Sequence, residues 1–334
     1  MSNFYLSRRA LLGLALTSAL PVGSVWAAGQ PLPVVASFSI LQDLTRQVGG
    51  ELVSVSTLVG PDGDAHVFEP TPQQARQLQQ AKVLVSNGLD FESWLLRLKK
   101  AAGFKGQEIV ASQGIAVRAL PKGQGHDHGH DHGADKAGHD HDHDHGHGHG
   151  HGHGHNHGPN DPHAWQDVKN AIVYVRNIAK GLATADPANA AQYDKQATQY
   201  IARLTALDAS LRQRFAAVPA ARRTVVSTHD AFGYFAQAYG LRFVPVRGLS
   251  TESEPSARDM AALVKQVREA RIGAIFLENI SDPRLLEQLA RETGAAIGGR
   301  LYSDALSPAT GPAATYIDMV ETNAATLLKA LQPG

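Results

Sequence analysis

The histidines of this chain offer its clearest chemistry. Fourteen of the seventeen lie in one run, in which they alternate with glycine or aspartate. The run has no apolar side chains large enough to build a core, so it predicts a solvated, flexible segment. Imidazole suits Zn, Cu and Ni, and we therefore interpret the run as an auxiliary metal-collecting loop, with a passive insertion as the alternative. Its members are His126, His128, His130, His132, His139, His141, His143, His145, His147, His149, His151, His153, His155 and His157.

The other three histidines are far apart in the sequence. They are His66, His163 and His229, and each lies in a segment with the pattern of an ordered fold. Three histidines and one further donor form the ligand set of a tetrahedral zinc site. A single loop histidine is more often a surface or packing residue, but all three lie at the ends of predicted elements. We therefore interpret the rest of the chain as a scaffold that brings them together.

Two of these histidines follow predicted β-strands. His66 comes after a strand at 52–58 and the loop Val59–Ala65, and His229 comes directly after a strand at 224–227. Ligands of open α/β sheets bind beyond the carboxyl ends of the strands. This placement predicts that both imidazoles point into one site.

The hydrophobic pattern alternates between strands and helices in both halves of the chain, which predicts parallel sheets flanked by helices. We expect two similar α/β lobes, joined by one long rigid helix at 189–217 of roughly 40 Å, with a metal site in the cleft between the lobes. The expected strands are 33–38, 52–58, 82–86, 108–111, 115–120, 224–227, 242–246, 273–277 and 295–298. The expected helices begin near residues 41, 72, 94, 168, 189, 231, 256, 283 and 313.

The domain boundaries follow from shifts in composition. Residues 1–27 have the features of an export signal of the secretory or twin-arginine type: Arg8 and Arg9, the apolar run Ala10–Leu20, and small residues before a cleavage point after Ala27. We then expect an N-terminal α/β lobe at 28–165 with a disordered His-rich insertion at 123–160. A helical segment at 166–220 and a C-terminal α/β lobe at 221–334 complete the chain.

Composition excludes several classes of protein. Lys+Arg and Asp+Glu balance at 31 each, which argues against a nucleic-acid partner. The apolar run of the export signal is too short to span a bilayer. The absence of cysteine removes disulfides, thiolate ligands and any lipid-anchor cysteine. We therefore expect a protein that is free in a periplasm and not membrane-anchored.

Five motifs resemble those of the metal-binding receptors of bacterial zinc and manganese ABC importers. They are DAHVFEP at 64–70, NDPHAW at 160–165, STHDAFGY at 227–234, GLSTESEPS at 248–256 and YSDAL at 302–306. The resemblance covers nearly the whole chain after the export signal, apart from the His-rich insertion. It implies a solute-binding protein that is a monomer, with an importer permease and its cytoplasmic ATPase as partners, and with a periplasmic metallochaperone as a further partner.

The resemblance also implies the ligand set, which is His66, His163, His229 and Asp304. Manganese-type relatives typically have glutamate at the third position, so His229 favours Zn2+ as the bound ion. Ala65 departs from the proline or glutamate that often precedes the first histidine, so more depends on Asp304, with water as the substitute fourth ligand. The cysteine pair of some zinc-type relatives is also missing.

Other carboxylates have weaker claims to a role. Glu69 is a candidate to orient His66, and Asp230 to orient His229 or to cap the next helix. Glu278 ends a predicted strand and ranks below Asp304 as a ligand. Glu252 and Glu254 fit solvated surface charges or permease contacts.

Three other functions compete with zinc capture. One is a manganese or nickel receptor of the same kind, and another is a zinc buffer or chaperone that stores ions on the His-rich loop. The third is a zinc hydrolase, which would need an open coordination position and a general base. The sequence contains no HExxH motif, so we expect a protein that is not an enzyme.

Overall fold

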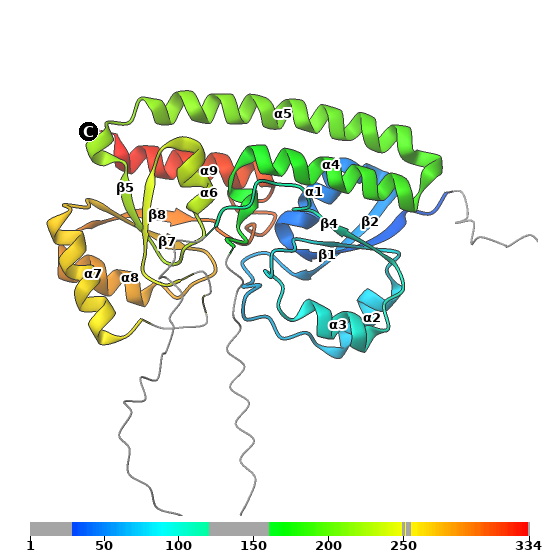
Figure 1. Ribbon diagram of the computed structural model, residues 1–334, viewed down its shortest axis with the longest axis horizontal. Coiled ribbons are helices and arrows are strands. Elements are labelled where there is room, and N and C mark those ends of the chain that lie inside the picture. The colour runs from blue at the N-terminus through cyan, green and yellow to red at the C-terminus, as the bar shows by residue number, and fades with distance from the viewer. Residues whose placement is uncertain (1–28, 120–159, 249–250, 252–254, 333–334) are drawn as a thin grey trace, which may run out of the picture. The chain divides into compact units, whose positions relative to one another are not determined.

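The first lobe is a four-stranded parallel sheet with helices packed against it (Figure 1). The computed structural model describes residues 29–119, 160–248, 251 and 255–332, and all its helices and strands lie in one compact unit, 31–334. The strand order is β2-β1-β3-β4. The elements of this lobe are β1 (Leu32–Phe38), α1 (Ser39–Gly49), β2 (Val53–Val59), α2 (Pro72–Gln80), β3 (Val83–Ser86), α3 (Leu95–Ala102) and β4 (Gln107–Val110).

The second lobe repeats this arrangement. Its strand order is β6-β5-β7-β8, and all its strand pairs are parallel. In both sheets the strand that comes first in the chain, β1 or β5, lies inside the sheet. The strand order reverses next to this strand, and open α/β sheets bind ligands at such a position. The elements of this lobe are β5 (Thr224–Ser227), α6 (Gly233–Tyr239), β6 (Arg242–Pro245), α7 (Ala257–Glu269), β7 (Ala274–Glu278), α8 (Arg284–Thr293) and β8 (Ala296–Leu301).

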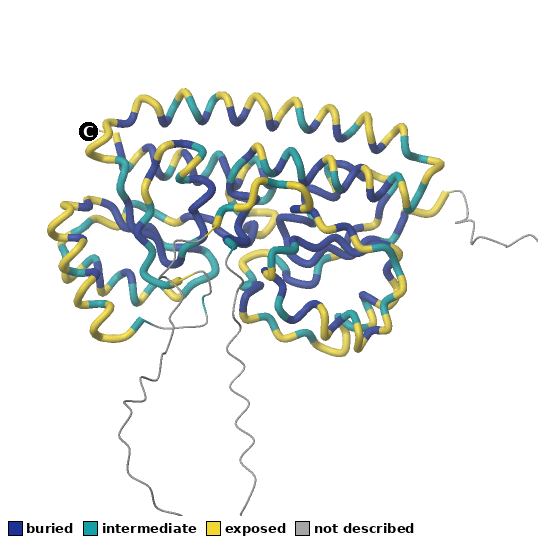
Figure 2. Tube along the Cα trace, in the orientation of Figure 1, coloured by how far each residue is buried: buried dark blue, intermediate teal, exposed yellow. Residues whose placement is uncertain are grey.

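Three further helices lie outside these two repeats: α4 (Val168–Ala185), α5 (Ala190–Ala216) and α9 (Tyr316–Leu331). The 27 residues of α5 extend about 40 Å and pass along both lobes (Figure 1). Figure 2 shows that α5 exposes its outer side, whereas Tyr193, Leu204 and Leu211 on its inner side are buried. This helix confirms the predicted long connection.

One large hydrophobic core runs through both lobes. It includes Phe38 of β1, Leu204 of α5, Phe276 of β7 and Leu327 of α9. A smaller cluster around Leu263 fills the space between the second sheet and the helices α7 and α8. Because the lobes share the large core, moving one against the other would disturb close-packed side chains.

Most predicted elements are present within a few residues, but the predicted strand at 115–120 is wrong. The described part of that stretch makes only an isolated bridge between Ala119 and Asn160. Arg118 donates its backbone N–H to the hydroxyl of Tyr234 at 2.9 Å, so the segment leaves the first sheet and contacts the second lobe. Among the described residues, no helix combines the length and apolarity needed to cross a bilayer.

Some predictions concern residues outside the described part of the chain. These are the export signal at 1–27, the fourteen histidines between His126 and His157, and the carboxylates Glu252 and Glu254.

Candidate metal centre

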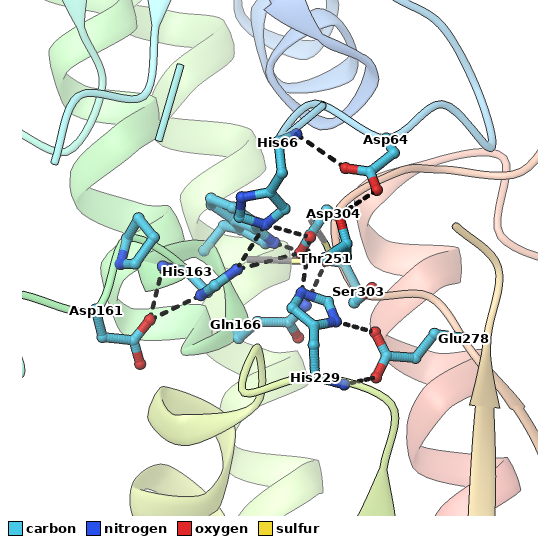
Figure 3. A network of polar contacts seen from close by, with 12 residues as sticks. Asp64, His66, Asp161, His163, Gln166, His229, Thr251, Glu278, Ser303 and Asp304 are labelled. Carbon is cyan, nitrogen blue, oxygen red and sulfur yellow. Dashed lines mark hydrogen bonds and ion pairs between the residues drawn. The ribbon is translucent and has the colours of Figure 1, made fainter. Parts of the chain in front are cut away.

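The structure brings His66, His163, His229 and Asp304 together (Figure 3). His66 ends the loop after β2, and His163 lies just before the helical turn that leads into α4. His229 follows β5, and Asp304 follows β8. One ligand atom from each residue lies within 4.8 Å of the others, and all four side chains are buried. Four segments that are far apart in the sequence therefore meet at one point.

The distances between donor atoms suit a single cation. The Nε2 atoms of His66 and His163 are 3.3 Å apart. Oδ2 of Asp304 lies 3.1 Å from Nε2 of His66 and 3.0 Å from Nε2 of His229. Metal–ligand bonds of about 2.0–2.1 Å in a tetrahedron separate the ligand atoms by roughly 3.3–3.4 Å. These residues could hold a metal ion with only small adjustments.

Asp161 fixes the orientation of His163. Its Oδ1 lies 2.9 Å from Nδ1 of His163 and accepts the backbone N–H of the same residue at 3.0 Å. A carboxylate only accepts, so Nδ1 carries the proton and Nε2 presents its lone pair to the site. Arg118 donates to Oδ2 of Asp161 at 2.8 Å and holds the carboxylate in place.

Glu278 fixes His229 in the same way from the end of β7. Its Oε2 lies 2.6 Å from Nδ1 of His229, and its Oε1 accepts the backbone N–H groups of Thr228 and His229 at 2.8 and 3.0 Å. Glu278 therefore lies behind the imidazole. The orienting role considered for Asp230 belongs to Glu278, and α6 begins after Phe232, so Asp230 does not cap it either.

The backbone around His66 is held by two side chains. Oδ1 of Asp64 accepts the backbone N–H of His66 at 2.9 Å, and Nε1 of Trp94 donates to the carbonyl of Ala65 at 2.8 Å. Glu69, the sequence candidate for orienting His66, is exposed.

Sequence reasoning gave no role to Asp64 or Asp161. The sequence did contain a pattern that could have identified both residues, because each is an aspartate two positions before one of the clustered histidines. Both carboxylates accept the N–H of that histidine, as in an Asx turn.

Burial and neighbouring charges shift the pKa values of His229 and Asp304 in opposite directions. Burial lowers the pKa of His66 and favours its neutral form. Burial alone would also lower the pKa of His229, but the carboxylates of Glu278 and Asp304 raise it well above its ordinary value. Burial alone would raise the pKa of Asp304, but His229 and His163 hold it well below its ordinary value. The cluster thus keeps an ionised carboxylate beside three imidazoles.

The chain is similar to known metal-binding proteins over almost its whole length. Residues 34–330 match the family described as zinc-uptake complex component A, periplasmic. The iron-binding protein YfeA of Yersinia pestis is 28% identical over 320 residues, covering 96% of this chain and 93% of that protein. The metal ABC transporter substrate-binding lipoprotein SloC of Streptococcus mutans is 27% identical over 322 residues, covering 95% and 96%.

A solved structure has the same fold. The periplasmic zinc-binding protein TroA from Treponema pallidum matches with a TM-score of 0.77 and 27% identity, covering 91% of this chain and all of that one. The match to the family extends through the segments that carry all four clustered residues. The chain therefore belongs to the family of zinc-uptake complex component A, periplasmic.

Proposed function

We propose that this protein captures Zn2+ in the periplasm and delivers it to the permease of an ABC importer, with His66, His163, His229 and Asp304 as the ligands of the cargo ion. The observation that carries the proposal is the buried cluster of four donor residues. Their nearest donor atoms lie 3.0–3.3 Å apart. Evidence from the relatives supports the transport role, because SloC is named as an ABC transporter substrate-binding protein.

The donor chemistry favours zinc. Three imidazoles and one carboxylate suit Zn2+, whereas Mn2+ prefers more oxygen donors. The carboxylates behind His163 and His229 strengthen this preference, because they fix the Nε2 lone pairs toward the ion. An iron or manganese receptor is the main alternative, since YfeA is named for iron.

The same cluster favours binding over catalysis. Four protein donors fill a tetrahedral site, whereas a catalytic zinc keeps one position open for water or substrate. We therefore propose that the protein is not an enzyme. A hydrolase would require water in place of Asp304, which is buried and 3.0 Å from Nε2 of His229.

The remaining parts of the proposal concern residues outside the described structure. The signal at 1–27 would export the chain, and the absence of cysteine leaves no thiol for a lipid anchor. We also propose that the protein is a monomer. The His-rich loop at 126–157 would collect zinc and raise its local concentration near the buried site. A periplasmic metallochaperone is a further candidate partner.

Zinc stoichiometry tests this function. The exported chain is titrated with Zn2+ against a chromophoric chelator, beside a variant that lacks residues 125–158. We expect one tight site in both proteins and additional weaker sites only in the full chain. Many equal weak sites, all lost with the loop, would favour metal storage. Tighter binding of Mn2+, Fe2+ or Ni2+ than of Zn2+ would reassign the cargo, and zinc-dependent hydrolysis would favour an enzyme.

A further inference from the structure

Asp304 follows the last strand of the second lobe, but residues near His66 and His163 hold the backbone on both sides of it. The segment 303–306, called here the Asp304 segment, begins two residues after β8 ends at Leu301. Its polar contacts show which part of the protein determines where Asp304 lies.

Residues next to His163 hold the start of the Asp304 segment. The carbonyl of Ser303 accepts hydrogen bonds from Nε1 of Trp165 at 2.9 Å and from Nε2 of Gln166 at 2.6 Å. All three residues are buried, so water does not compete for these bonds. Figure 3 shows Gln166 and Ser303 beside the cluster.

Residues before His66 hold the end of the segment. Leu306 donates its backbone N–H to Oγ of Ser39 at 2.9 Å, and its carbonyl accepts the backbone N–H of Asp62 at 2.9 Å. Ser39 begins α1, and Asp62 lies in the loop that leads to His66. Further along, the N–H of Tyr316 bonds to Asp43 of α1 at 2.8 Å, so the start of α9 is also attached to the first lobe.

The second lobe contacts the same segment differently. Asn279, directly after β7, donates to the carbonyl of Ala305 at 3.1 Å and to Oδ1 of Asp62 at 2.9 Å. His229, in contrast, is oriented within the second lobe, where Glu278 bonds to its ring and to its backbone. The second lobe therefore determines the position of His229 more directly than that of Asp304.

We infer that Ser39 and Gln166 are positioning residues for Asp304, which they hold through the backbone on either side of it. Ser39 acts from α1 of the first lobe and Gln166 from the turn after His163, so the position of Asp304 is set partly from outside the lobe whose last strand leads into it. The inference rests on the proposed capture of a metal ion.

The test removes two of the side-chain contacts to the Asp304 segment, one at each end, without changing any of the four clustered residues. The variants are Ser39→Ala, Gln166→Leu and the double variant. Thr45→Val is the matched control, because Thr45 is a buried residue of α1, like Ser39, and its hydroxyl donates to the carbonyl of Leu41 within that helix. Zn2+ affinity is measured by chelator competition, the visible spectrum is measured with Co2+, and the melting temperature is measured without metal.

We expect the double variant to bind Zn2+ about tenfold more weakly, with smaller losses in the single variants, as for residues that orient metal ligands. The Co2+ spectrum of the double variant should lose intensity as Asp304 withdraws and water enters. The control should match the wild type in both measurements. If the double variant does not fold, the two single variants decide the question, because they act on opposite ends of the segment.

Wild-type affinity and an unchanged Co2+ spectrum in folded variants would overturn the positioning role while leaving the proposed function intact. An equal loss in Thr45→Val would also overturn it, because the effect would then be general destabilisation. Failure of the wild type to bind one Zn2+ tightly is a different result and would overturn the proposed function itself.

Discussion

Asp161→Asn tests whether the carboxylate behind His163 prepares that imidazole for a metal ion. Oδ1 of Asp161 accepts both N–H groups of His163, and Oδ2 accepts from Arg118. Asparagine keeps the shape but has one acceptor oxygen and one amide nitrogen, which only donates. Either His163 or Arg118, both of which donate to Asp161, must therefore face the amide nitrogen, which cannot accept.

The magnitude follows from the two ways the asparagine can lie. If its oxygen faces His163, the tautomer of His163 is kept. The amide nitrogen then takes the place of Oδ2, the acceptor that lies 2.8 Å from the guanidinium of Arg118. If its nitrogen faces His163, the proton moves to Nε2 and blocks the metal. Changes to residues that orient metal ligands cost about 10–100-fold in affinity, or roughly 1.4–2.7 kcal/mol. We expect a loss within this range.

The assay is chelator competition with Zn2+ at neutral pH, together with thermal unfolding of the metal-free protein. Asp167→Asn is the control, because the side chain of Asp167 caps α4 by accepting from Lys169 at 2.9 Å, and asparagine caps a helix equally well. The control should bind Zn2+ like the wild type. Wild-type affinity in folded Asp161→Asn would refute the reasoning that the carboxylate sets the tautomer of His163.

Three further predictions concern pH, metal choice and the His-rich loop. Glu278 and Asp304 outweigh the effect of burial and raise the pKa of His229, so zinc must displace a proton from His229 at neutral pH. The Zn2+ affinity should therefore rise with pH, by up to about tenfold per pH unit, until His229 is deprotonated in the metal-free protein. Calorimetry in buffers of different ionisation enthalpy should detect the released proton, and a heat independent of the buffer would contradict the pKa shift. His229→Glu replaces a nitrogen donor by oxygen, so the ratio of Zn2+ to Mn2+ affinity should fall, as measured by competition between the two ions; an unchanged ratio would remove His229 as the basis of zinc preference. Deleting residues 125–158 should leave the equilibrium affinity of the buried site unchanged but slow zinc capture at limiting metal in stopped-flow measurements, and equal rates would reject the collecting role of the loop.

Local sequence pattern predicted most of the fold. The strand at 224–227 is present with the same bounds, and the helix at 189–217 differs from α5 by a residue at each end. These elements follow from hydrophobic periodicity and from helix and strand boundaries, which depend on neighbouring residues. The strand at 115–120 failed because Arg118 bonds to Tyr234, more than a hundred residues away.

The candidate site could be predicted only in part. His66 and His229 follow strands, and the structure places both in one cluster with His163 and Asp304. The contacts that orient the cluster join residues distant in sequence, such as Glu278 to His229 and Ser39 to Leu306. They depend on how the two lobes pack, which no local pattern specifies.

The most direct test of the central claim is a competitive Zn2+ titration of the wild type beside His66→Ala, His163→Ala and His229→Ala. If these imidazoles share one ion, the wild type binds a single tight Zn2+, and each substitution weakens that same site by a large factor while the weaker sites on the His-rich loop remain. Tight one-to-one binding that survives any of the three substitutions unchanged would contradict the claim.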